Sequence, residues 1–168
     1  MSISMYQAFI PPTIRTLTNL AAILDKIAAH AEAHKVDPTV FVAARLFPDM
    51  LPFVKQIQIA SDTVKGGAAR LAGQEAPKFE DDEASFPELH ARIQKTIAYL
   101  KGFQPEQIDG SEDKDITLVM RNGELHFKGL AYLTSYVLPN LYFHVTTAYA
   151  IARSNGVDLG KRDFLGQV

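Results

Sequence analysis

The chain has 168 residues, of which 47% are hydrophobic and 21% are charged, a balance that is typical of a globular protein with one sizeable core. We therefore expect one domain over residues 1–168. The net charge is −2 and the basic residues are scattered, so nucleic acid is not an expected partner. The lack of cysteine excludes disulfides, thiolate nucleophiles and cysteine zinc sites.

The N-terminal segment has neither the basic start nor the apolar centre of a signal peptide, and no lipidation motif is evident, so we expect a cytoplasmic protein. Residues 129–152 contain no Asp, Glu, Lys or Arg over a length that could cross a bilayer. The same run contains Asn140, His144 and a central Pro139, which a lipid-facing helix would rarely carry. We expect a helix buried by protein and no membrane partner.

Two helices and a short connecting helix are predicted in the first half of the chain. Apolar residues at spacings of three and four predict an amphipathic helix over residues 12–35. Asp37 as N-cap and Pro38 at the first helical position then indicate a short helix. A long helix is expected from about Asp49 to Leu71, with Asp49 as its N-cap or, alternatively, facing a pocket.

The second half predicts two further helices and a hairpin. Ser85 and Glu88 form a capping-box pattern before a helix that ends near residue 101. Asn122-Gly123 lies between two β-prone runs and predicts a hairpin over about residues 116–128. A last helix runs to about residue 155 and is expected to kink or restart at Pro139. Together these elements predict an all-α protein, an antiparallel four-helix bundle with a small β-hairpin before the last helix.

A polar strip on the last helix is the candidate site. Asn140, His144 and Thr147 fall on one helix face, and Asp49 and Gln56 share a face of the second long helix, so all five are predicted to reach one cavity. In one interpretation they form a ligand-binding wall with His144 as the catalytic base. In the other, they satisfy one another's hydrogen bonds in the core. His30 and His34 are also spaced like a metal pair, although a solvated last helical turn is the commoner explanation.

Three stretches carry a resemblance to a known family: SMYQAFIPPTIRTLTNLAAILDKIAAHA, RLFPDMLPFVKQIQIASDTVKGGAARLAG and FHVTTAYAIARSNGVDLGKRDFLG. They resemble an uncharacterised bacterial family of unknown function that is similar to the DinB/YfiT-like four-helix bundles. The resemblance implies a bundle that is often dimeric, with a pocket at one end. Because the first and last helices are also rich in apolar residues, we expect a homodimer.

Relatives in that superfamily bind a divalent metal through a histidine on the second helix and an H-x-x-x-H pair on the last, and some are thiol-dependent transferases or isomerases. Here His144 matches the second histidine of the pair, whereas Asn140 stands at the first. The second helix offers Asp49 or Gln56 and no histidine. An amide is a poor substitute for imidazole at a zinc or nickel site, so we expect no metal and no cofactor.

Two functions are consistent with these features. The first is a small-molecule-binding or transferase-like protein whose pocket, at one end of the bundle, surrounds His144. The second is a non-catalytic dimeric bundle in which the strip is a polar core cluster.

Overall fold

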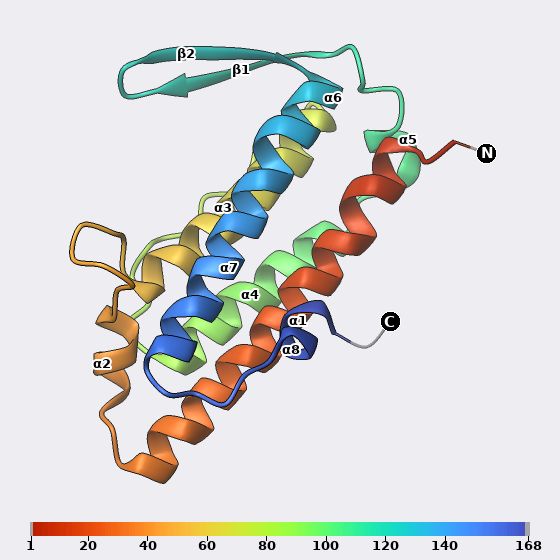
Figure 1. Cartoon of the computed structure of the whole chain (residues 1–168). Coiled ribbons are helices and arrows are strands. Elements are labelled where there is room, and N and C mark those ends of the chain that lie inside the picture. Colours follow the sequence, from red (N-terminus) through yellow and green to blue (C-terminus); the bar gives the residue numbers. More distant parts are fainter. Residues whose placement is uncertain (1, 167–168) are drawn as a thin grey trace.

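The computed structural model describes residues 2–166, and within them four long helices pack side by side (Figure 1): α1 (Met5–His34), α3 (Phe53–Leu71), α4 (Phe86–Lys101) and α7 (Leu138–Ser154). The shorter elements are α2 (Pro38–Ala43), α5 (Pro105–Ile108), α6 (Gly129–Tyr132), the η1 segment (Leu133–Val137), α8 (Lys161–Leu165) and the strands β1 (Asp115–Met120) and β2 (Gly123–Lys128). The chain is therefore mostly helical with a small antiparallel hairpin before the last helix, as the sequence predicts.

Two pairs of long helices are antiparallel, as expected. The backbone N–H of Tyr6, at the start of α1, donates at 2.7 Å to the carboxylate of Asp109, which ends the short helix α5 that follows α4. Arg70, at the end of α3, donates to the Tyr132 hydroxyl before α7, at 3.2 Å. Each pair therefore joins the start of one helix to the end of the other.

The neighbours α3 and α4, in contrast, run parallel, which the prediction of a wholly antiparallel bundle missed. Both begin at the end of the bundle where Phe41 of α2 packs against Phe86. At the opposite end, Lys114 donates to the carbonyl of Leu71, the last residue of α3. The non-helical segment 72–85 runs back along the bundle, from the end of α3 to the start of α4 (Figure 1). At roughly 3.3 Å per residue, its length is sufficient to span a helix with a rise of about 1.5 Å per residue.

The buried guanidinium of Arg92 on α4 holds this crossover in place. It donates to the Glu83 carboxylate and the Glu80 carbonyl, each at 2.8 Å. Asp62 of α3 and Asp81 of the crossover also lie within 3.0 and 3.1 Å of the guanidinium. Burial lowers the pKa of Arg92, but the hydrogen bond with Glu83 and the three carboxylates more than offset this, so its pKa is raised. The acidic loop is therefore fixed to both parallel helices.

Helix α1 begins seven residues earlier than the sequence predicts, at Met5 instead of residue 12. Ser4 and Gln7 form a capping box that satisfies the first N–H groups, and the helix continues through Pro11 and Pro12. Prolines normally interrupt a helix because they lack an N–H. Here the first turns bury apolar side chains completely, including those of Phe9 and Ile10. Packing against the core therefore outweighs the local preference.

Helix α3 begins four residues later than predicted, and Asp49 does not cap it. Pro52 occupies the N-cap position, and residues 44–52 are non-helical. The ring of Pro52 disfavours helical backbone at Leu51, which explains the late start. The expected capping role of Asp49 was wrong, and its side chain is exposed.

The last helix neither ends nor restarts at Pro139. It is continuous from Gly129 through α6, η1 and α7. Over Leu133–Val137 it is a π-helix, in which each backbone hydrogen bond spans five residues instead of four. The N–H of Leu138 bonds to the carbonyl of Leu133, five residues back, and this wide turn accommodates the N–H that proline lacks. No helix within residues 2–166 is long and apolar enough to cross a membrane.

The hairpin forms where it was predicted, with a different turn. Met120 pairs with Gly123, so Arg121 and Asn122 are the two turn residues and Gly123 begins the second strand. Gly123 has a φ of 138°, which favours glycine. The asparagine-glycine pair thus marks the hairpin correctly, but the chain reverses one residue earlier.

Candidate functional site

His144 of α7 and Gln56 of α3 form a buried pair between the two helices. The side chains are 8% and 2% exposed, and His144 Nδ1 lies 2.7 Å from Gln56 Oε1. The pair lies near the start of α3, where the Gln56 Nε2 group donates to the Leu51 carbonyl at 2.9 Å. Antiparallel packing of α3 and α7 therefore brings together two of the five predicted site residues, 88 positions apart in the chain.

The hydrogen bonds of Gln56 determine which nitrogen of His144 carries the proton. The carbonyl of Leu51 can only accept, so the amide NH₂ of Gln56 must face it. The amide oxygen then faces Nδ1 of His144, and a short contact with an acceptor requires a proton on Nδ1. In neutral His144 the other nitrogen, Nε2, consequently carries a lone pair.

His144 is held in this neutral form. Burial lowers the pKa of its imidazole, because removal from water penalises the charged ring. Within residues 2–166 no protein group hydrogen-bonds to Nε2, and Nε2 is not among the unpaired buried atoms. This nitrogen therefore keeps some contact with solvent although the residue is buried. The ring of Phe143 packs edge-on against the imidazole at 5.2 Å between centroids.

The remaining predicted site residues do not contact His144 through hydrogen bonds. Asn140 donates to the Tyr136 carbonyl at 2.6 Å, and Thr147 donates to the Phe143 carbonyl at 2.8 Å. Both bonds are to the carbonyl four residues back on the same helix. Asp49 lies in the exposed 44–52 segment and forms no hydrogen bond within the described part of the chain. We expected these five side chains to hydrogen-bond to one another across the bundle. Among them, only His144 and Gln56 do so.

The residues do not fit the metal site of the superfamily. Within residues 2–166 no group of three or more His, Cys, Asp or Glu side chains is placed to hold a metal ion. Gln56 Oε1 is occupied by the Nδ1–H of His144, and Asn140 contributes a weakly basic amide. The rings of the spaced pair His30 and His34 stack with 4.1 Å between their centroids, and Nδ1 of His34 bonds to the His30 carbonyl.

A hollow of about 590 Å³ lies elsewhere at the same end of the bundle, and sequence reasoning missed it. It is lined by α1, α2 and α4, and His144 is not among its residues. The available signal was the pair of small residues Ala28 and Ala31 on the apolar stripe of α1, opposite Pro38 and Pro87. Small and ring-restricted side chains leave space where larger ones would fill it.

Comparison with known proteins agrees with this architecture. A family model described as a domain of unknown function (DUF1993) matches residues 5–165. The chain is also similar to a crystal structure described as a DinB family member protein from Shewanella denitrificans, with 40% sequence identity and a TM-score of 0.89. That match covers 97% of this chain and 92% of the other. No curated protein matches.

Proposed function

The chain belongs to the DUF1993 family, a domain of unknown function, and for this member we propose that it binds a small molecule through the accessible nitrogen of His144. The observation that carries the proposal is the fixed tautomer: Gln56 holds the proton on Nδ1, and the lone pair of Nε2 has no hydrogen-bond partner within residues 2–166. A lone pair accepts a hydrogen bond, so the ligand should present a hydroxyl, thiol or amine.

The surroundings of His144 support a binding role. Phe143, whose ring packs against the imidazole, is 58% exposed, and Leu51, whose carbonyl orients Gln56, is 46% exposed. Large exposed apolar side chains beside a polar group are typical of ligand contacts. Asn140 directs its NH₂ group to the backbone, which leaves its amide oxygen as a second acceptor on the same helix face. Thr147, one turn beyond His144, completes the proposed strip of ligand-binding residues.

The catalytic role that we propose for His144 follows from the same lone pair. Nε2 can take the proton of a bound thiol or hydroxyl, which makes that group a better nucleophile for a transferase-like reaction. Gln56 continues to accept the Nδ1–H bond from the resulting imidazolium. No metal takes part in this proposal, because the donor set does not fit one.

Nuclear magnetic resonance of the imidazole nitrogens tests the proposal. In the free protein at pH 7.5 we expect the His144 Nε2 resonance to report an unprotonated nitrogen and Nδ1 a protonated one. Titration with 2-mercaptoethanol, propanol and propylamine should shift Nε2 of His144 for at least one probe and leave the exposed His126 unchanged. A protonated Nε2, or no shift with any probe, would reject the proposal.

The alternative function, a non-catalytic homodimer, has a different observation in its favour. The apolar stripes of α1 and α7 are buried within the chain itself, so they do not support the dimer as the sequence interpretation assumed. The hairpin region instead exposes Val119 at 79%, together with Met120, Leu125 and Leu130. The open strand edges of this hairpin can pair with a second copy, with Val119 on one face of the hairpin and Met120 and Leu125 on the other.

Light scattering at micromolar concentration tests the dimer. We expect a mass of twice 18.6 kDa for the unaltered chain if the hairpin pairs with a second copy, and the monomer mass for the Val119→Lys/Leu125→Lys variant. Val40→Lys, at another exposed apolar side chain, is the matched control. A monomeric unaltered chain would reject this alternative.

A further inference from the structure

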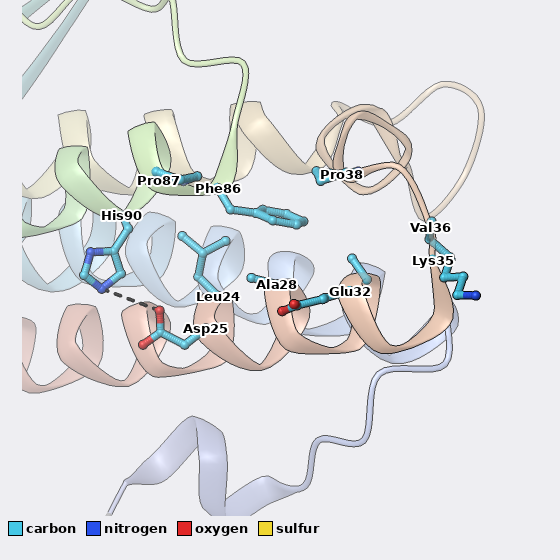
Figure 2. A pocket seen from close by; sticks show the side chains of 11 residues that line it. Leu24, Asp25, Ala28, Glu32, Lys35, Val36, Pro38, Phe86, Pro87 and His90 are labelled. Carbon is cyan, nitrogen blue, oxygen red and sulfur yellow. Dashed lines mark ion pairs between the residues drawn. The ribbon is translucent and has the colours of Figure 1, made fainter.

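The hollow between α1, α2 and α4 has an apolar floor (Figure 2). Leu24 and Ala31 of α1 and Phe86 of α4 are buried and form its base. Pro38 and Pro87, at the first turns of α2 and α4, line its sides. The prolines are restricted by their rings and the alanines are short, so these side chains leave the space between the helices unfilled. Its volume of about 590 Å³ is in the range of small-molecule sites.

The rim of the hollow is acidic. Asp25 and Glu32 are seven residues apart on α1 and therefore share a helix face, and both line the hollow. Within residues 2–166 no lysine or arginine lies within ion-pair distance of either carboxylate. His90 Nε2 is 3.7 Å from Asp25, too far for a hydrogen bond. Lys35, the one fully cationic side chain among the lining residues, points away from the hollow (Figure 2).

We propose that this hollow binds a small organic cation, an ammonium group carried on an apolar body. The apolar body would contact Leu24, Ala28 and Phe86, and the ammonium would lie between the two carboxylates. An anionic ligand would meet the carboxylates and is disfavoured.

This site is separate from the His144 site. It lies on the α1–α4 pair, whereas His144 and Gln56 lie between α3 and α7. The lining residues of the two sites do not overlap. A ligand can therefore be detected at one site without involving the other, and failure of either proposal leaves the other standing.

Three probes with the same phenyl body but different charge test the proposal: benzylammonium, benzyl alcohol and benzoate. Binding is followed at pH 7.5 by the methyl resonances of Leu24, Ala28 and Ala31 in nuclear magnetic resonance spectra. We expect benzylammonium to shift these methyl groups at lower concentration than benzyl alcohol, and benzoate to bind weakest. Equal or tighter binding of benzoate or benzyl alcohol would overturn the assignment of a cation, and no shift with any probe would overturn the site.

Two variants separate charge from shape. Asp25→Asn/Glu32→Gln should weaken benzylammonium by about tenfold and leave benzyl alcohol unchanged, since one exposed ion pair contributes up to about fivefold. Ala28→Leu, which fills the hollow, should abolish binding of all three probes. Glu124→Gln on the hairpin, an exposed acid away from the hollow, is the control and should change nothing. Unchanged benzylammonium affinity in both test variants would overturn the proposal.

Discussion

The Arg92 cluster and the His144–Gln56 pair both bury polar side chains between long helices, but they are satisfied in opposite ways. Arg92 is charged and contacts three carboxylates and a backbone carbonyl, which come from α3 and from the crossover 72–85. Burial favours the neutral form of His144, and within residues 2–166 its one side-chain hydrogen-bond partner is Gln56. In the charged cluster, the guanidinium of Arg92 holds the crossover 72–85 against α3 and α4. The neutral pair leaves one nitrogen, Nε2 of His144, without a protein partner in the described part of the chain.

A buried charge is expensive unless it is paired, so the difference should appear in the stability of variants. If Arg92 is structural, its loss should affect folding most and ligand binding least. If His144 is functional, its substitution should lower the free energy of unfolding by less than is usual for a buried, hydrogen-bonded polar side chain.

The largest effect is expected for Arg92→Met, which leaves the carboxylate of Glu83, 10% exposed, without its cation. We expect the free energy of unfolding to fall by about 3 kcal/mol, at the lower end of the range for a broken buried pair because Asp62 and Asp81 are partly exposed. Urea denaturation measures the loss. Hydrogen exchange should also accelerate over residues 78–85.

Arg121→Met, in the exposed hairpin turn, is the matched control and should change stability by less than about 0.5 kcal/mol. If Arg92→Met costs no more than this control, the cluster does not hold the crossover.

The second largest effect is expected for Gln56→Leu. It leaves the Nδ1–H of His144 without an acceptor, and an unsatisfied buried group costs about 1–3 kcal/mol. The double variant His144→Phe/Gln56→Leu removes both partners, so it should recover much of that loss. Urea denaturation of the single and double variants gives the coupling energy. Purely additive losses would show that the two side chains do not interact as described.

These two regions were not equally predictable from the sequence. The short-range signals were sufficient for Ser85 as an N-cap of α4 and for Asp37 as an N-cap of α2, because a cap bonds within its own first turn. The Arg92 cluster depends on the parallel arrangement of α3 and α4, which no local pattern encodes. The acidic loop 72–85 therefore gave no sign that it crosses the bundle.

The candidate site was predictable in part for a similar reason. His144 and Gln56 stood out as polar residues on apolar helix faces, and antiparallel packing of α3 and α7 joins them. The side chains of Asn140 and Thr147 bond instead to their own helix, since the carbonyl four residues back is always within reach. Asp49 was misplaced because the break before Pro52 extends further than the pattern indicates.

The third effect is a pH dependence of stability that belongs to His144. Its pKa is lowered in the folded state, so the unfolded chain, with a pKa of about 6.5, takes up the proton first as the pH falls. Well above the unfolded pKa neither state binds this proton, so His144 causes no pH dependence there. As the pH falls from the unfolded pKa to the folded pKa, the free energy of unfolding decreases progressively. We expect the stability difference between the unaltered chain and His144→Gln to shrink between pH 7.5 and 5.5, measured by urea denaturation. A difference that is constant over this range would show that the ring is not buried in its neutral form.

The smallest effect on stability is expected for Asn140→His, which changes a half-buried residue with one bond to its own helix. Without metal, the free energy of unfolding should change by less than about 1 kcal/mol. The substitution nevertheless places a second imidazole one turn before His144, and the carbonyl of Gln56 on Nδ1–H is the kind of partner that orients metal-binding histidines. Calorimetry on protein without a histidine tag should therefore show tighter zinc binding in Asn140→His than in the unaltered chain, and the gain should vanish in Asn140→His/His144→Ala. Stoichiometric zinc or nickel in the unaltered chain, lost on His144→Ala, would contradict our proposal that the family metal site is absent and would make the His144 region a metal centre.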